Sequence, residues 1–158
     1  MSTPQHRSSA LHALGLDAAW LAARIEESPV LLDLTDGMPR FERAVPRSGP
    51  EQFAVILFDP ADGTRLIVEV QAGDADTDQL ARALDLWTTE RNRLPVAHRV
   101  VLAAEHVPDD VARAAALASA SAPVELLELL AERTGKIVTV HGEPLPLPGA
   151  DGPVAPAS

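Results

Sequence analysis

A glutamate and a glutamine two residues apart, in the segment RLIVEVQ at 65–71, are the side chains whose types and spacing best suggest chemistry. In a strand, residues two apart project from the same face, so Glu69 and Gln71 would act together. A carboxylate is a hard oxygen ligand that suits Mg²⁺ or Mn²⁺. A buried carboxylate is also costly unless it is paired. Glu69 is therefore either a metal ligand or the partner of an arginine, for which Arg43 and Arg82 are the candidates.

The segment that carries Glu69 has the pattern of a central strand. Apolar side chains of residues 65–71 occupy both faces, as in a strand that is covered on both sides. The apolar run Phe53–Phe58 precedes it, and the turn segment Asp59–Gly63 lies between the two. Two strands joined by a short loop with Asp and Gly form an antiparallel hairpin.

A helix and a parallel strand should follow this hairpin. Asp76, with Gln79 three residues later, is typical of a capping box, and the helix should run to about Leu94. The next apolar run, Val100–Ala104, predicts a strand. A strand, a helix and a second strand in this order form a crossover unit, so the second strand should pair in parallel with residues 66–70.

The remaining segments supply flanking elements. Asp17 is expected to N-cap a helix over Ala18–Glu27, and residues 40–45 alternate weakly as in a first strand. A further helix should begin at Asp109 and end near Ala120.

Residues 123–133 fit two structures. Their composition (VELLELLAER) favours a helix, whereas the turn residues Thr134–Lys136, followed by IVTV, favour a hairpin between two strands. Both interpretations stay open at the level of sequence.

These elements predict an α/β fold with a central mixed β-sheet of about four to six strands and helices on its faces. A chain of 158 residues is a natural size for one domain. We expect that domain over residues 8–143, between a flexible N-terminus at 1–7 and a flexible tail at 144–158 that is rich in proline, glycine and alanine.

The composition restricts partners and compartment. The net charge of −10, with 23 acidic against 13 basic residues, opposes general affinity for nucleic acid, because phosphate contacts need clustered positive charge. The chain has no cysteine, so it has no disulfide framework and no thiolate metal site, and a cytoplasmic location is expected. No apolar run is long enough to cross a bilayer, so we expect no membrane partner.

The sequence EVQAGDADTDQLARALDLWTTERNRLPVAHRVVLAAE at 69–105 resembles a PD-(D/E)xK nuclease-like superfamily of small bacterial proteins. It follows that family's order of a strand ending in Glu-x-Gln or Glu-x-Lys, a glycine, an Asp-led helix with a tryptophan near its end, and a Val-Leu-x-Ala-Glu strand. LDAAWLAARIEESPVLL at 16–32 is similar to the family's N-terminal helix and the proline after it. The resemblance implies a restriction-endonuclease-like core.

The resemblance also implies roles for the matching residues. Glu69 takes the place of a metal-binding glutamate, and Gln71 takes the place of the lysine that orients the attacking water. Asp17 falls where the N-terminal helix often carries a glutamate, so Glu69 and Asp17 are the implied metal ligands. Ala54 and Ala44 fall where the family carries acidic residues. The resemblance therefore implies a degenerate active site.

Other polar groups have weaker signals. The aspartates in 74–78 gather where a helix begins, and helix N-termini attract acidic residues. His98 and His106 flank a strand without a partner at zinc-ligand spacing. Glu105 follows a parallel strand at its carboxyl end, where α/β proteins often place function.

Three functions follow from these observations. The first is a catalytically degenerate PD-(D/E)xK-like domain that acts in binding or assembly, needs no cofactor, and has a protein partner or a second copy of itself as its target. The second is an active nuclease for DNA or RNA that uses Mg²⁺ or Mn²⁺ at Glu69, Gln71 and Asp17. The third is an acidic protein-interaction module that shares only the topology, since fold does not fix function.

Overall fold

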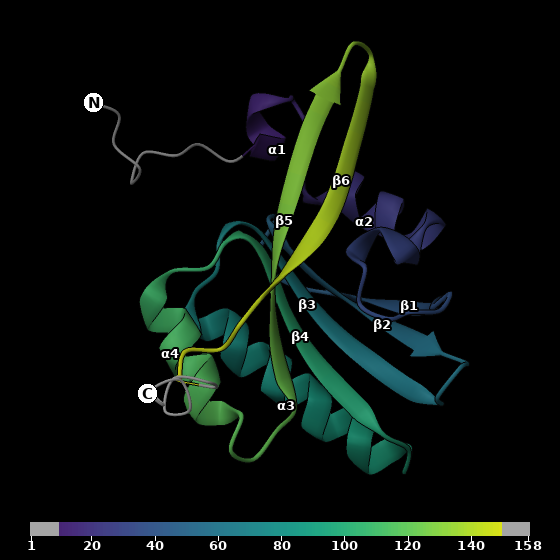
Figure 1. Ribbon diagram of the computed structural model, residues 1–158, viewed down its shortest axis with the longest axis vertical. Coiled ribbons are helices and arrows are strands. Elements are labelled where there is room, and N and C mark those ends of the chain that lie inside the picture. The colour runs from purple at the N-terminus through teal and green to yellow at the C-terminus, as the bar shows by residue number, and fades with distance from the viewer. Residues whose placement is uncertain (1–9, 150–158) are drawn as a thin grey trace, which may run out of the picture.

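The computed structural model describes residues 10–149, which form a six-stranded β-sheet with helices on both faces (Figure 1). The strands are β1 (Arg40–Pro46), β2 (Gln52–Asp59), β3 (Thr64–Asp74), β4 (His98–His106), β5 (Val124–Thr134) and β6 (Ile137–Leu145). The helices are α1 (Ala10–Ala13), α2 (Ala18–Glu27), α3 (Thr77–Arg93) and α4 (Asp109–Ala118), with the 3₁₀ helix η2 (Pro29–Leu32) after α2.

The six strands lie in the sheet in the order of the chain. The pairs β1–β2, β2–β3 and β5–β6 are antiparallel, whereas β3–β4 and β4–β5 are parallel. The predicted α/β fold with a mixed sheet is confirmed. The antiparallel hairpin of β2 and β3 and the parallel pairing of β3 with β4 are confirmed as well, with Val68 opposite Val55 on one side and Val101 on the other.

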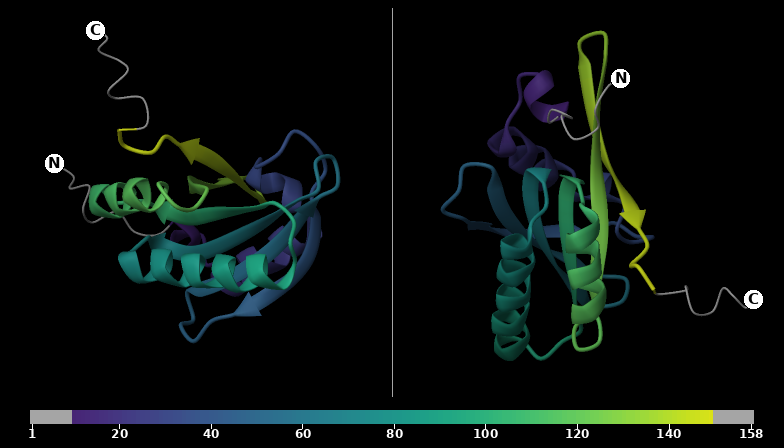
Figure 2. Two further views of the ribbon diagram at one scale, coloured as in Figure 1. Left: turned by 90° about the horizontal axis from the view of Figure 1, so that it is seen from below. Right: turned by 90° about the vertical axis from the view of Figure 1, so that its left-hand side faces the viewer.

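Each face of the sheet has its own apolar cluster. Leu66, Val68 and Val70 of β3 pack with α1, α2 and η2, while Ile67 packs on the opposite face with α3 and α4. The right-hand view of Figure 2 shows α3 and α4 side by side. Because successive residues of a strand alternate between faces, Glu69 and Gln71 project with Ile67 towards α3.

The segment that fitted both a helix and a strand is strand β5. Its residues pair with β4 on one side and β6 on the other, with Leu126 opposite Leu102 and Leu145. The helical interpretation of 123–133 is thus wrong. Leu126 and Leu127 are both buried, on opposite faces of the sheet, and this two-sided burial outweighs the small helix preference of the individual residues.

The predicted ends of α2, α3 and α4 agree with the structure to within two residues, whereas β3 and β4 extend beyond the predicted strand segments. Asp17 caps α2 by accepting a hydrogen bond from the Trp20 amide, as predicted. Gly73, with a φ of +83°, lies within β3, which continues to Asp74 after a shift in its pairing with β4. Strand β6 runs to Leu145, two residues beyond the predicted domain end. The flexible N-terminus expected at 1–7 and residues 150–158 of the tail expected at 144–158 lie outside the described residues.

Candidate functional site

Glu69 lies at the centre of the sheet, and its side chain is fully buried. Its neighbours across the strands are Ala54 on β2 and Leu102 on β4. Directly opposed residues of paired strands project from the same face, so the place next to Glu69 on β2 holds a methyl group. The register thus sets Ala54, a position where the resemblance implies a lost acidic residue, beside Glu69.

Two guanidinium groups hold the Glu69 carboxylate. Arg47, which follows the end of β1, donates from Nε to Oε2 at 3.0 Å and from Nη2 to Oε1 at 2.6 Å. Arg82 of α3 places its Nε 3.5 Å from Oε2. A planar guanidinium that bonds both oxygens of a carboxylate is the strongest common form of this pair. Arg82 is thus a confirmed partner.

The prediction that Arg43 pairs with Glu69 is wrong, and Arg47, the main partner of Glu69, was not predicted. Arg43 pairs with Glu90 of α3 instead of Glu69. Arg43 lies in the middle of β1, opposite Ile56, whereas Arg47 directly follows the strand, two residues beyond Val45, which lies opposite Ala54. Because Ala54 is the neighbour of Glu69 on β2, Arg47 is the arginine that reaches the carboxylate. The sequence pattern of residues 40–45 does not fix this register.

Burial sets the protonation chemistry of Glu69. Removal from water raises the pKa of its carboxyl above the ordinary value, and the hydrogen bonds and positive charges of Arg47 and Arg82 oppose that rise. The two arginines therefore stabilise the charged form of Glu69 without fully compensating for the loss of its hydration.

Gln71 lies on the same face as Glu69, nearer the end of β3. Its Nε2 donates to the Asp74 carbonyl at 2.7 Å and to Asp76 Oδ2 at 3.2 Å. Its Oε1 accepts from Arg82 Nη2 at 3.1 Å. Arg82 thus links Gln71 to Glu69, and the structure brings these two predicted site residues into one polar cluster.

Gln79 is a buried residue of this cluster whose role was missed by sequence reasoning. The side-chain Nε2 of Gln79 donates hydrogen bonds to the Glu69 carbonyl at 3.0 Å and to the Ala103 carbonyl at 2.9 Å. The side-chain Oε1 accepts no hydrogen bond from any other described residue. As predicted, Asp76 caps α3 by accepting from the Gln79 amide N–H at 2.8 Å. The Gln79 side chain, however, turns inward and ties α3 to β3 and β4.

Asp17 and Ala44 are not part of this cluster. Asp17 begins α2, whose Leu21 and Ile25 pack on the sheet face opposite to Glu69. Ala44 of β1 lies opposite Val55, which also belongs to that other face. The structure therefore brings Glu69 and Gln71 together and leaves Asp17 on the far side of the sheet.

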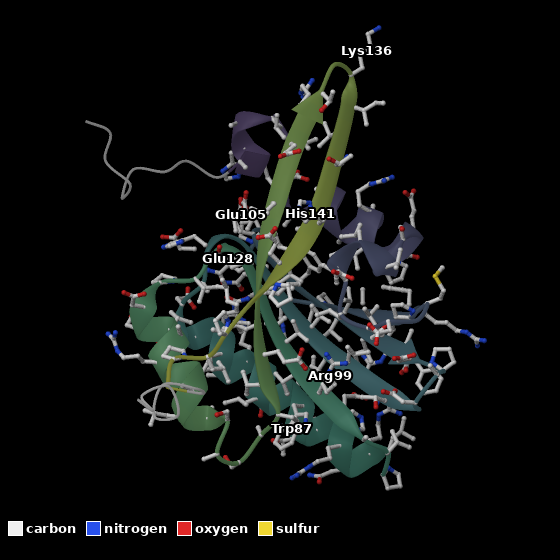
Figure 3. All side chains as sticks on the ribbon, in the orientation of Figure 1. Trp87, Arg99, Glu105, Glu128, Lys136 and His141 are labelled. Carbon is white, nitrogen blue, oxygen red and sulfur yellow. The ribbon has the colours of Figure 1, made fainter. Side chains whose placement is uncertain are left out.

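Two structural glutamates, Glu105 of β4 and Glu128 of β5, lie where the parallel pairing of these strands ends (Figure 3). Glu105 accepts hydrogen bonds from the backbone amides of Leu11 and Gly73, at 3.0 and 2.8 Å. Glu128 accepts one from the amide of Val107 at 3.1 Å. These bonds fasten α1, the end of β3 and the residue that follows β4.

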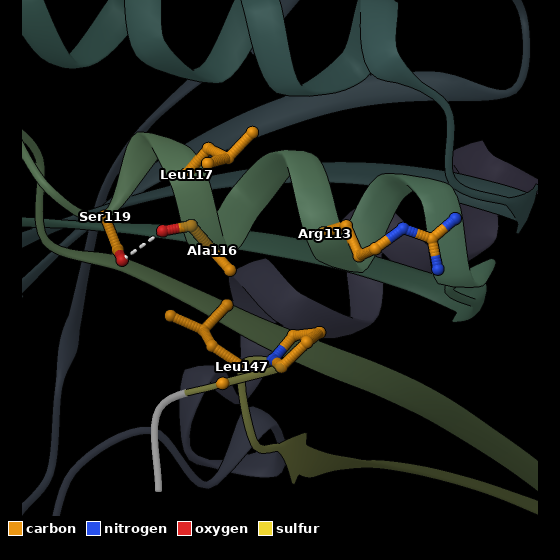
Figure 4. Close-up of a pocket in the computed structure, with 7 residues that line it drawn as sticks. Arg113, Ala116, Leu117, Ser119 and Leu147 are labelled. Atoms are coloured by element: carbon orange, nitrogen blue, oxygen red, sulfur yellow. Dashed lines mark hydrogen bonds between the residues drawn. The ribbon is translucent and has the colours of Figure 1, made fainter. Parts of the chain in front are cut away.

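Within residues 10–149, no group of three or more His, Asp or Glu side chains is arranged to hold a metal ion. A cavity of about 560 Å³ lies between α4 and residues 147–149 (Figure 4), but its lining is largely apolar, with Arg113 and Ser119 as its polar side chains. None of the described helices is long and apolar enough to span a membrane.

Comparison with known proteins supports the fold. No family model matches this sequence, and no curated protein matches it significantly. Among solved structures, the apo form of the nuclease EndoMS is similar, with a TM-score of 0.57 and 20% sequence identity over 71% of this chain. The match covers 46% of the EndoMS chain, so this chain corresponds to about half of that protein. The fold of the chain is thus nuclease-like.

Proposed function

We propose that this chain is a PD-(D/E)xK-like domain without nuclease activity, which acts in binding or assembly. The observation that carries the proposal is the bidentate bond between Arg47 and Glu69, because it uses both carboxylate oxygens that a metal ion would need. An arginine side chain thus takes the place that the resemblance assigns to a cation.

The charge around Glu69 supports this proposal. Arg47 and Arg82 bring two positive charges to one buried carboxylate, so a divalent cation would enter against a net repulsion. Magnesium is held by hard oxygen ligands in octahedral geometry, commonly including carboxylates. The place across the hairpin that would supply a second carboxylate holds Ala54.

Gln71 fits a structural role better than a catalytic one. Its amide has no positive charge to stabilise a transition state, and both ends of the amide are engaged within the protein. With a net charge of −10, a protein partner is favoured over nucleic acid. We propose that no metal cofactor is required and that the domain works in the cytoplasm.

The test is calorimetric titration of Mn²⁺ and Mg²⁺ into the full chain and into a Glu69→Gln variant. A matched control is Glu125→Gln, because Glu125 also forms a bidentate pair, with Arg99, but at the surface. We expect no heat that depends on Glu69, and no metal-dependent cleavage of single- or double-stranded DNA or RNA. Metal binding that is lost in Glu69→Gln and kept in Glu125→Gln would contradict the proposal.

An active Mg²⁺- or Mn²⁺-dependent nuclease is the second candidate, favoured by the position of Glu69 and by the nuclease-like fold. It requires Arg47 to leave Glu69 and an acid other than Asp17 to approach. Cleavage that disappears in Glu69→Gln would support this candidate.

A further inference from the structure

The two edges of the sheet differ in how they are protected. Edge strand β1 carries the charged side chains of Arg40, Glu42 and Arg43, and its pairing with β2 shifts between Phe41 and Arg43. Charged side chains and bulges are devices that keep an edge strand from pairing with another chain. Edge β1 is therefore blocked.

Edge strand β6 carries neither device over most of its length. It pairs with β5 without a shift from Leu126–Leu145 to Thr134–Ile137. The segment Ile137–Gly142 contains no proline, lysine, arginine, aspartate or glutamate. In an antiparallel pair every second residue turns its N–H and C=O away from its neighbour, so β6 presents a regular row of such groups.

The outer edge of β6 has no strand partner among the described residues, and η2 packs against the strand near Gly142. Among the described residues, β6 makes no backbone hydrogen bond with any element other than β5. The hairpin of β5 and β6 projects beyond the other strands (Figure 1), and β6 borders the molecule in the right-hand view of Figure 2. At its tip the side chain of Ile137 is 66% exposed. A second strand therefore has access to this edge.

We propose that two copies of this chain pair through β6, in antiparallel orientation, to form one continuous sheet. The charges at the two ends of β6 favour a second copy as the occupant. Lys136 lies at the hairpin tip (Figure 3), and Glu143 lies near the other end of the strand. Antiparallel pairing about the middle of the strand brings the basic end of each copy to the acidic end of the other.

The middle of β6 suits a two-fold axis. With the axis at Thr139, the two Thr139 side chains lie opposite each other and Ile137 of each copy lies opposite His141 of the other. Threonine pairs across antiparallel strands are favourable. An isologous contact of this kind closes on itself, so the assembly stops at a dimer.

This inference is independent of the function proposed for Glu69. No residue of β6 contacts the cluster formed by Arg47, Glu69 and Arg82. Dimerisation can therefore fail or hold whatever the result of the metal titration.

The first test is sedimentation equilibrium of the full chain over a range of concentrations. We expect a mass that rises to twice the 16.7 kDa of one chain. Thr139→Lys sets two lysines opposite each other and should return the protein to 16.7 kDa with an unchanged circular dichroism spectrum. The matched control Thr134→Lys, on an exposed residue of the inner strand β5, should remain a dimer. A monomer at all concentrations, or a dimer that survives Thr139→Lys, would overturn the proposal.

The second test uses the absence of cysteine from the sequence. Thr139→Cys introduces a single thiol, and in the proposed dimer two such thiols lie close enough to form a disulfide. Mild oxidation should give a cross-linked dimer with Thr139→Cys but not with Thr134→Cys. Equal cross-linking of both variants would show random collision and contradict the proposed register.

Discussion

Two buried glutamates of this protein, Glu69 and Glu90, differ in how far their arginine partners compensate for the burial of the carboxylate. Glu69 lies on the central strand β3 and is held by Arg47 and Arg82. Glu90 lies on α3, and three arginines surround it, namely Arg43, Arg65 and Arg93.

Their pKa values move in opposite directions. Burial raises the pKa of Glu69, because desolvation outweighs its two guanidinium partners. Burial also disfavours the charged form of Glu90, but the hydrogen bonds from Arg93 and Arg65 and the charge of Arg43 outweigh it, so the pKa of Glu90 is lowered. A buried carboxylate with arginine partners is therefore not in itself the mark of an active site. In this chain Glu90 is the better compensated of the two, and the difference can be measured.

Loss of Glu90 should have the largest effect. Glu90→Ala leaves three arginines without their common partner, and one of them, Arg65, is buried with 3% of its side chain exposed. We expect a loss of about 3–5 kcal/mol in the free energy of unfolding, measured by urea denaturation. The control Glu27→Ala removes an exposed pair with Arg24 and should cost less than about 1 kcal/mol. A loss as small as that of the control would mean that the network does not stabilise the fold.

Loss of Glu69 should cost less. In Glu69→Ala the side chains of Arg47 and Arg82, which are 18% and 25% exposed, can turn towards water. We expect a loss of about 2 kcal/mol by the same measurement, within the range for unpaired buried polar groups. A loss equal to that of Glu90→Ala would show that the two carboxylates are equally well compensated.

Lowering the pH should destabilise the fold through His98, which contacts Arg65, a partner of Glu90. The ring donates from Nδ1 to the Val96 carbonyl and accepts from Arg65 Nη1 at Nε2, which requires the neutral form. Burial first, and then the charge of Arg65, lower the pKa of His98, while Val96, Glu90 and Glu42 oppose that shift.

The direction of the pH effect follows from that shift. Just below pH 6.5 the unfolded chain binds a proton at His98 that the folded chain does not bind, so stability is full above about pH 6.5 and falls as the pH is lowered. The slope from this one group is at most about 1.4 kcal/mol per pH unit. Urea denaturation between pH 5 and 8 should show this dependence in the wild type and lose it in His98→Asn. An identical slope in both proteins would exclude His98 as the source.

Asp17 should give the smallest effect. Asp17→Ala removes the side-chain oxygen that caps α2, and we expect a loss of about 1 kcal/mol in stability. Asp17→Asn keeps a capping oxygen and should restore most of the loss. A change in Mn²⁺ affinity in Asp17→Ala would contradict its placement away from Glu69.

Local patterns were sufficient for most of the fold. Alternating and continuous apolar runs predicted β2, β3 and β4, and the side-chain caps at Asp17 and Asp76 marked the starts of α2 and α3. The composition of residues 123–133 could not decide between helix and strand, since the burial that makes β5 comes from β4 and β6.

The site was harder to predict, because it depends on contacts between distant segments. Glu69 and Gln71 were predictable from their spacing on one strand. The Arg47 contact spans 22 residues and depends on how the chain turns after β1. The inward turn of Gln79 has no local signal, because its side chain bonds two backbone carbonyls of neighbouring strands.

The most direct test of the central claim is Mn²⁺ titration of the ¹⁵N-labelled protein, followed by the broadening of its amide signals. A bound Mn²⁺ ion broadens the signals of nearby amides, so the spectrum reports where it lies. If Arg47 occupies the position that a metal ion would take at Glu69, the amide signals of Ala54 and Glu69 will broaden no more than that of exposed Glu132. Selective broadening at Ala54 and Glu69, lost in Glu69→Gln, would show that the carboxylate binds metal and would contradict the account.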